Sequence, residues 1–129
     1  MAYRVYDADR LVLGSGIEDH LRVTVCLWHP FASSGSDVFG SGTFDRPWLR
    51  AGLDPLAAGR ANLDAAFGFI ARLGVPFYCF QDRDIAPEGR TFAETHAHLD
   101  AMVDYAGEHM ARTGVRLLWG TANLFGHPR

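Results

Sequence analysis

Three short apolar segments alternate with two longer amphipathic segments along this chain, and this order constrains the fold more than any other feature. The apolar segments span residues 21–28, 75–80 and 115–119, and the amphipathic segments span residues 55–73 and 92–113. Segments of these lengths and periods predict strands and helices in the order strand, helix, strand, helix, strand. Since each helix connects two strands, we expect parallel strands with right-handed crossovers and an α/β fold.

Each amphipathic segment has its own start and stop signals. Asp54 stands before a proline, which is typical of a helix start, and Gly74 supplies a C-terminal stop. Thr91 and Glu94 suggest a capping box, and Gly114 ends the second helix. The residues that we expect to face the core are Leu56, Leu63, Ala66, Phe67, Ile70 and Leu73 in the first helix and Phe92, Leu99, Met102, Val103, Ala106 and Met110 in the second.

Composition argues against several classes of function. The formal net charge is -3, and the 12 positive residues, all arginine, are scattered, so we expect no nucleic-acid partner. No apolar run approaches the roughly 18 residues of a membrane span, so we expect no membrane partner. The first ten residues are too polar for a signal peptide, and the length fits one domain. We therefore expect a cytoplasmic protein with a single domain over residues 1–129.

The chain has two cysteines, and both lie inside apolar segments. This placement of Cys26 and Cys79 favours buried reduced thiols over a disulfide or a metal ligand. No cysteine and histidine cluster has the spacing of a zinc site.

Polar and aromatic residues follow each predicted strand. The carboxyl ends of parallel strands converge over one mouth, so these residues form the candidate site. Asp82 and Asp84 are two residues apart, so only one of them is expected to face the mouth, and a solvated loop pair is an equal alternative. The residues at the three strand ends are Trp28 and His29; Gln81, Asp82 and Asp84; and Trp119, Thr121, Asn123 and Phe125.

Two other spacings resemble motifs, but neither predicts a metal site or a phosphate-binding loop. His96 and His98 are about 200° apart around a helix axis, so they cannot bind one ion together. His96 and Asp100 are one turn apart, which favours a surface hydrogen bond over a metal site. The sequence GSG at residues 40–42 lacks the strand, the helix and the lysine of a phosphate-binding loop.

Five stretches of the sequence together resemble the N-terminal portion of xylose isomerase, in particular its longer class II form. They occur in the same order and with similar spacing. Xylose isomerases are (β/α)8 TIM barrels that use two divalent ions, usually Mg, Mn or Co, to convert xylose to xylulose and glucose to fructose. The resemblance implies a partial barrel of about three strands and two helices. The stretches are LVLG, HLRVTVCLWHPF, SDVFGSGTFDRPW, VPFYCFQDRDIAPEG and GVRLLWGTANLFGHPR.

The resemblance also implies roles for single residues. The family has a ring-opening histidine where this chain has Gln81, and Asp84 matches the aspartate that orients it. A glutamine amide has no proton relay near neutral pH, so ring opening loses its agent. Ser33 replaces a pocket tryptophan. Phe39 matches a phenylalanine that a neighbouring subunit inserts into the site. The residues counted as substrate-binding candidates are Trp28, Ser33, Phe39, Trp119, Thr121 and Phe125.

The family's metal ligands and its essential lysine lie in later strands, and this chain has no lysine. We therefore expect no metal site and no cofactor in this chain. The resulting expectation is a shortened xylose isomerase-like protein, a pseudoenzyme as an isolated chain, with an aldose sugar as its candidate ligand. The alternative is an active aldose–ketose isomerase in which an oligomer or a partner supplies the rest of the barrel.

A three-stranded parallel sheet with both helices on one face leaves its other face and its edges uncovered. We expect a homo-oligomer in which the faces that would line a complete barrel pack together. The glycine- and serine-rich loop over residues 30–52 is long for a compact domain, which indicates a functional or interface segment. This loop is expected to add contacts between copies.

Overall fold

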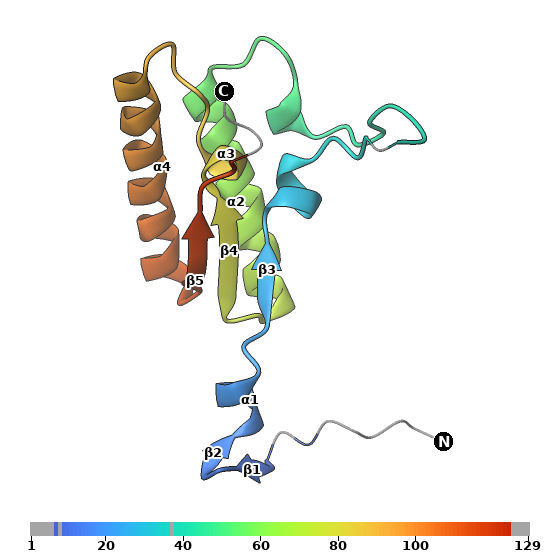
Figure 1. The fold of residues 1–129 in the computed structure, drawn as a ribbon, viewed down its shortest axis with the longest axis vertical. Helices are drawn as coiled ribbons and strands as arrows, with labels where there is room; N and C mark the ends of the chain where they lie inside the picture. Colours follow the sequence, from blue (N-terminus) through green and yellow to red (C-terminus); the bar gives the residue numbers. More distant parts are fainter. Residues whose placement is uncertain (1–6, 8, 37, 125–129) are drawn as a thin grey trace.

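The computed structural model describes residues 7, 9–36 and 38–124 (Figure 1). Its centre is a parallel sheet of three strands in the order β3 (Thr24–Cys26), β4 (Phe77–Gln81) and β5 (Arg116–Thr121). The predicted α/β order of elements is therefore confirmed. The sheet and its helices are consistent with part of a (β/α)8 barrel.

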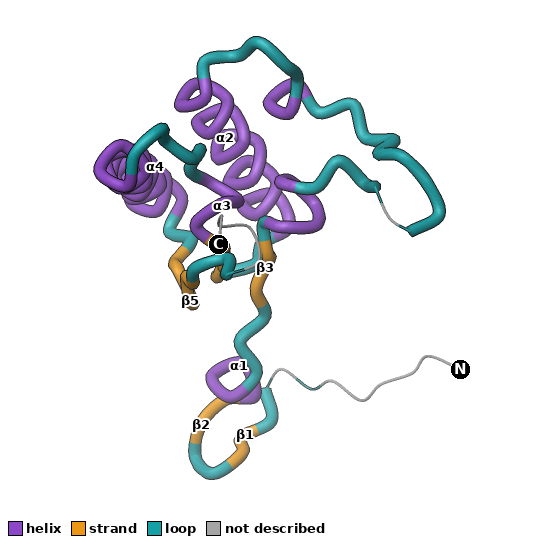
Figure 2. Tube along the Cα trace, turned by 45° about the horizontal axis from the view of Figure 1, so that its top comes forward, coloured by secondary structure: helices purple, strands orange, loops and turns teal. Residues whose placement is uncertain are grey.

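The two long helices, α2 (Pro55–Leu73) and α4 (Phe92–Thr113), cover the same face of the sheet, as Figure 2 shows. Tyr78 of β4 demonstrates this, because its ring meets Phe67 of α2 at 4.9 Å between centroids and its hydroxyl lies 3.6 Å from Met110 Sδ of α4. The core therefore lies between the helices and one side of the sheet. Its buried apolar residues include Leu27, Leu63, Phe67, Ile70, Tyr78, Ile85, Met102 and Ala106.

Helix starts and stops follow the sequence closely. Asp54 accepts the Ala57 N–H at 2.7 Å, as predicted. Gly74 and Gly114 end their helices with φ of 72° and 75°, a backbone region that favours glycine. The capping box at α4 is only half formed: Thr91 accepts the Glu94 N–H, but the Glu94 carboxylate accepts from the backbone of Arg90 instead.

Two details of the predicted elements are wrong. The first strand is shorter than residues 21–28, because its pairing with β4 begins only at Thr24 opposite Phe77. Residues 21–23 lie beyond the first paired residue of β4 and are not part of the strand. The second detail is the set of core-facing residues: Leu73 of α2 is 55% exposed, and Phe92 and Val103 of α4 are 80% and 48% exposed. The core side of α4 includes His109 instead.

Six short elements were not predicted. A small antiparallel hairpin and a helical turn precede β3 and extend away from the sheet (Figure 1). A π-helical turn follows β3, and one short helix, α3, follows β4 directly. None of the helices in the described residues is long and apolar enough to cross a membrane. These elements are β1 (Leu11–Val12), β2 (Ser15–Gly16), α1 (Ile17–His20), η1 (Trp28–Ala32), η2 (Pro47–Leu49) and α3 (Asp82–Ile85).

Candidate functional site

The carboxyl end of β4 turns at once into α3, and this turn forms the centre of the candidate site. The Asp84 carboxylate accepts the backbone N–H of Gln81 at 2.7 Å. In return, the Gln81 side chain accepts the backbone N–H of Asp84, which completes a capping box at the start of α3. Gln81 and Asp84 are thus held together by two hydrogen bonds within one turn.

The carboxylates of Asp82 and Asp84 accept hydrogen bonds from different partners. One Asp82 carboxylate oxygen accepts the backbone N–H of Arg83 and that of Asn123, each at 2.8 Å. Asp84 points back toward Gln81 instead. Asp82 therefore ties the segment after β5 to the segment after β4, which brings two of the three strand ends together.

Burial raises the pKa of the Asp84 carboxyl above its ordinary value. The Gln81 N–H opposes this rise, since a hydrogen bond to the carboxylate favours the charged form. The charge of Asp82 raises the pKa of Asp84 further, whereas His29 lowers it. Both charges therefore lie near enough to Asp84 to affect its carboxyl group.

An aromatic pair spans the uncovered face of the sheet at this end. Trp28 follows β3, and its ring lies 5.6 Å from that of Trp119 of β5, centroid to centroid. Trp119 is paired in register with Cys79, which alternates with Tyr78 and so faces away from the helices. Thr121 is paired in register with Gln81 at the same end of the sheet. The structure therefore brings Trp28, Gln81, Trp119 and Thr121 to one face at this end of the sheet.

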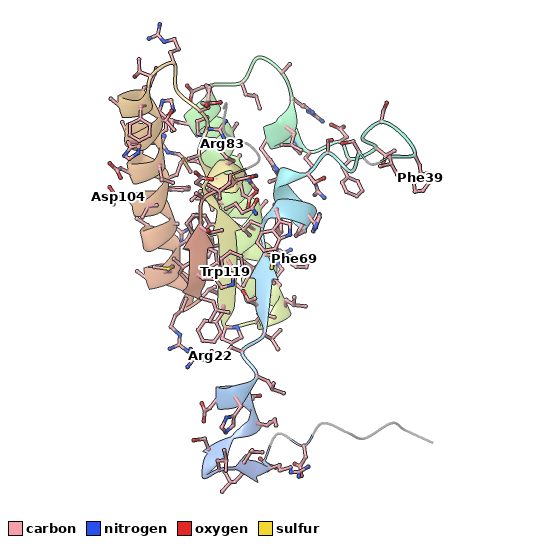
Figure 3. All side chains as sticks on the ribbon, viewed as in Figure 1. Arg22, Phe39, Phe69, Arg83, Asp104 and Trp119 are labelled. Atoms are coloured by element: carbon pink, nitrogen blue, oxygen red, sulfur yellow. The ribbon has the colours of Figure 1, made fainter. Side chains whose placement is uncertain are left out.

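Two further candidates, Ser33 and Phe39, follow η1 and lie outside the three-stranded sheet. The Ser33 hydroxyl accepts the Gly35 N–H at 3.0 Å, and the Ser33 carbonyl accepts from Arg46, so Ser33 shapes its own loop. Phe39 is 93% exposed at the far end of the long loop (Figure 3). Phe125 lies outside the described residues.

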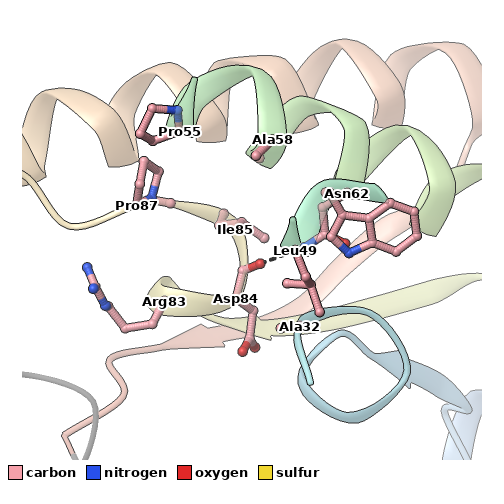
Figure 4. Close-up of a pocket in the computed structure, with 12 residues that line it drawn as sticks. Ala32, Leu49, Pro55, Ala58, Asn62, Arg83, Asp84, Ile85 and Pro87 are labelled. Atoms are coloured by element: carbon pink, nitrogen blue, oxygen red, sulfur yellow. Dashed lines mark hydrogen bonds between the residues drawn. The ribbon is translucent and has the colours of Figure 1, made fainter. Parts of the chain in front are cut away.

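A cavity of about 140 Å³ lies behind α3, between it, η2 and the start of α2 (Figure 4). Asn62 of α2 is buried at its edge and donates from its side-chain amide to the Asp84 carbonyl at 2.8 Å. The Asp84 carboxylate points away from this contact, as Figure 4 shows. Asn62 therefore anchors the backbone of α3 from the core side.

Sequence reasoning missed Asn62 as a supporting residue. The only sequence signal was that Asn62 is a polar residue next to Leu63 in a predicted amphipathic helix. A polar residue at such a position is equally compatible with a solvent-exposed face. The partner of Asn62 is the Asp84 backbone, which carries no sequence signature. A supporting contact of this kind becomes visible only in the folded chain.

The side chains at the mouth do not form the donor set of a divalent-metal centre. Within the described ranges, no three His, Cys, Asp or Glu side chains form a cluster that fits a metal ion. The carboxylates at the mouth already accept backbone N–H groups, and His96 and His98 are engaged separately, by the Phe92 ring and the Pro87 carbonyl. These residues do not fit the two divalent ions that the resemblance implies for the family.

Known relatives match the whole of this chain. It is 54% identical over 129 residues to the xylose isomerases of Burkholderia thailandensis and Burkholderia ambifaria, and 48% identical to that of Pseudomonas fluorescens. All of the chain is covered in each case, but it spans only 29% of the length of these curated relatives. No protein-family profile matches it. The resemblance to the N-terminal portion of xylose isomerase is therefore confirmed over the entire chain.

Proposed function

We propose that this chain is a xylose isomerase-like portion that does not isomerise sugars by itself and contributes part of an aldose-binding site. The identity to proteins named xylose isomerase supports the sugar class. The convergence of Trp28, Thr121 and Trp119 on one face supports a binding role, because aromatic rings offer large apolar surfaces to a sugar ring. Phe125 belongs to the same proposed site by resemblance.

The observation that carries the non-catalytic proposal is the use of Gln81. Its side chain accepts the Asp84 N–H as part of the α3 capping box, and the Asp84 carboxylate accepts the Gln81 N–H. By resemblance, this turn is the frame in which the family holds a titratable ring, but the residue in it here is an amide. An amide does not titrate near neutral pH, so it cannot serve as a general acid or base for ring opening.

An isomerase assay tests this proposal directly. Xylulose formation from xylose is measured with added Mg²⁺, Mn²⁺ or Co²⁺ for the wild type, Gln81→His, Ser33→Trp and the double variant. We expect no turnover by any of the four chains alone. Metal-dependent turnover by the wild type contradicts the proposal. Turnover only by the double variant shows that a further group supplies the metal site, which favours the alternative of an isomerase completed in an assembly.

Sugar binding is a separate measurement, because a chain without activity can still bind. Xylose is titrated while tryptophan fluorescence is followed in the wild type, Trp119→Phe and Trp48→Phe. Trp48 is the matched control, since its indole N–H donates to the Phe31 carbonyl in a different part of the chain. We expect a saturable change that Trp119→Phe removes and Trp48→Phe retains. No saturable change in the wild type contradicts the sugar site.

We further propose that copies of this chain associate through the uncovered face of the sheet. Strands β3 and β5 are the outer strands of the described sheet, and Trp119 remains 41% exposed on that face. Exposed strand edges and apolar faces favour further pairing. The exposed Phe39 loop is proposed to add contacts to a neighbouring copy.

Sedimentation at micromolar concentration tests the association. We expect Trp119→Glu to shift the chain toward monomer, because a carboxylate on the interface would lose its hydration. Val103→Glu is the matched control, since Val103 is similarly exposed at 48% but lies on a helix. A stable, well-folded wild-type monomer contradicts the proposal.

A further inference from the structure

The two cysteines of the chain face each other across adjacent strands. Cys26 of β3 and Cys79 of β4 are register partners in the parallel ladder. Their sulfur atoms are 3.1 Å apart, and the Cys79 thiol donates to the Cys26 sulfur. Both are free thiols, with Cys79 buried and Cys26 partly exposed. The sequence favoured buried reduced thiols over a disulfide, and it did not indicate this contact because the residues are 53 positions apart.

The backbone geometry suits a covalent link. Neighbouring strands are spaced by about 4.8 Å, and disulfides join residues whose Cα atoms are about 4.4 to 6.8 Å apart. The sulfur atoms need to approach by only about 1 Å to reach the bond length of about 2.0 Å. In the described part of the chain, the thiols belong to no cluster of three His, Cys, Asp or Glu side chains, so nothing favours a metal site over a bond between the sulfurs.

We propose that Cys26 and Cys79 form a reversible disulfide that links β3 to β4 beneath the candidate site, with a hydroperoxide as the oxidant. Cys26 reacts first because it is the more exposed thiol. After losing its proton, its sulfur attacks one peroxide oxygen, the O–O bond breaks, and hydroxide leaves and becomes water by taking up a proton. Cys26 is now a sulfenic acid.

Cys79 completes the bond. Its deprotonated sulfur attacks the Cys26 sulfur, the S–O bond breaks, and the second hydroxide leaves and is protonated to water. In total, two thiols and one hydrogen peroxide give one disulfide and two waters. The sulfurs lose two electrons and the peroxide gains them. A thiol reductant restores both cysteines.

The link closes a long loop of the chain, since η1, the glycine- and serine-rich loop over residues 30–52 and all of α2 lie between Cys26 and Cys79. A cross-link of this span restricts the unfolded chain more than the folded one. Oxidation is therefore expected to raise the melting temperature by on the order of 10 °C. This inference does not rest on the proposed sugar site, and its test uses no sugar and no activity.

The test exposes the purified chain to hydrogen peroxide and follows free thiols and intact mass. We expect both thiols to disappear while the mass of the monomer falls by about 2 Da, the two hydrogens lost. Trypsin should then release the peptides that begin at Val23 and Leu73 as one linked species, and a reductant should separate them. Addition of oxygen to either cysteine without linkage, or a bond that joins two chains, overturns the proposal.

A second measurement separates the role of the fold from chemical reactivity. The chain is equilibrated against mixtures of reduced and oxidised glutathione, both folded and in urea. For each chain we determine the ratio of reduced to oxidised glutathione at which half of the protein carries the disulfide. We expect this ratio to be at least tenfold higher for the folded chain than for the unfolded chain, because the fold brings the sulfurs together. An equal or lower ratio overturns the proposal. Cys26→Ser removes the mass change and, if folded, shows no peroxide-dependent rise in melting temperature.

Discussion

The carboxylate of Asp84 accepts the backbone N–H of Gln81 at 2.7 Å, and the side chain of Gln81 accepts the backbone N–H of Asp84. This reciprocal pair fixes the start of α3 at the end of β4. It does so with a carboxylate that is buried, since Asp84 is 8% exposed. Burial of the Asp84 charge lowers the stability of the folded chain, whereas the two hydrogen bonds raise it. Substitutions can separate these two effects.

Asp84→Asn and Asp84→Ala separate these effects. Asparagine keeps an oxygen that can accept the Gln81 N–H but carries no charge, so we expect a free energy of unfolding at pH 7 at least equal to that of the wild type. Alanine leaves the N–H without this acceptor, and we expect a loss of about 1–3 kcal/mol. Urea unfolding of the three chains checks both outcomes. An Asn variant as unstable as the Ala variant would mean that the charge itself stabilises the turn.

The pH dependence of the same variants has a definite sign. Burial raises the pKa of Asp84 in the folded chain, so the folded state binds this proton more tightly than the unfolded state. The stability that protonation provides is present at low pH and is lost as the pH rises through the raised pKa. The stability of the wild type should therefore approach that of Asp84→Asn as the pH falls. A gap that widens toward low pH would contradict the raised pKa.

The order of the large elements was predictable because it follows from local signals. Asp54, Gly74 and Gly114 act within one helical turn, and each marks a boundary that the structure has. The errors lie where a distant partner decides. Whether the residues before Thr24 belong to a strand depends on where β4 begins, and whether Val103 is buried depends on what packs against α4. Neither is encoded near the residue concerned.

The position of the candidate site at the strand ends was predictable for a different reason. The convergence of Trp28, Gln81 and Trp119 follows from the general geometry of parallel strands. The contact between Cys26 and Cys79 does not, because it requires the register of two strands and not only their order. A change of register by one residue would have turned one of the two side chains to the opposite face.

A buried hydroxyl on β3 offers a stabilising substitution. Thr24 Oγ1 is buried and has no hydrogen-bond partner within the part of the chain that the structure describes. Valine has nearly the same shape and no hydroxyl, so Thr24→Val should raise the free energy of unfolding by about 1 kcal/mol. Thermal unfolding measures this change. Val25→Thr is the matched control, since it places a hydroxyl among core residues on the opposite face and should destabilise the chain.

A buried histidine links the two long helices. Nε2 of His109 in α4 lies 2.9 Å from Oδ1 of Asp64 in α2. On the other side of the ring, Nη2 of Arg112 lies 2.8 Å from Nδ1 of His109. Arginine only donates, so Nδ1 accepts and Nε2 carries the hydrogen that is donated to Asp64. The ring also stacks on Phe67 at 4.7 Å. His109 therefore combines packing with a hydrogen bond between helices.

Replacement of His109 should destabilise the chain. His109→Ala loses both the stacked ring and the donor to Asp64, and we expect a loss of about 2–3 kcal/mol in the free energy of unfolding. His96→Ala, on the exposed side of the same helix, should change stability by less than about 0.5 kcal/mol. Urea unfolding compares the two. Equal effects would show that His109 contributes no more than an exposed residue.

The rate at which Cys26 reacts with hydrogen peroxide should depend steeply on pH. Burial raises the pKa of the Cys26 thiol to about 11, and Cys79 and the charge of Asp84 add to the rise. Only the thiolate attacks the peroxide, so the rate should increase about tenfold per pH unit between pH 7 and pH 9. Stopped assays of free thiol measure this slope. A rate that levels off near pH 8.5 would show that the thiol has an ordinary pKa.

Asp84→Asn provides the internal comparison, because removal of the neighbouring charge should lower the pKa of Cys26 and speed the reaction at every pH in this range.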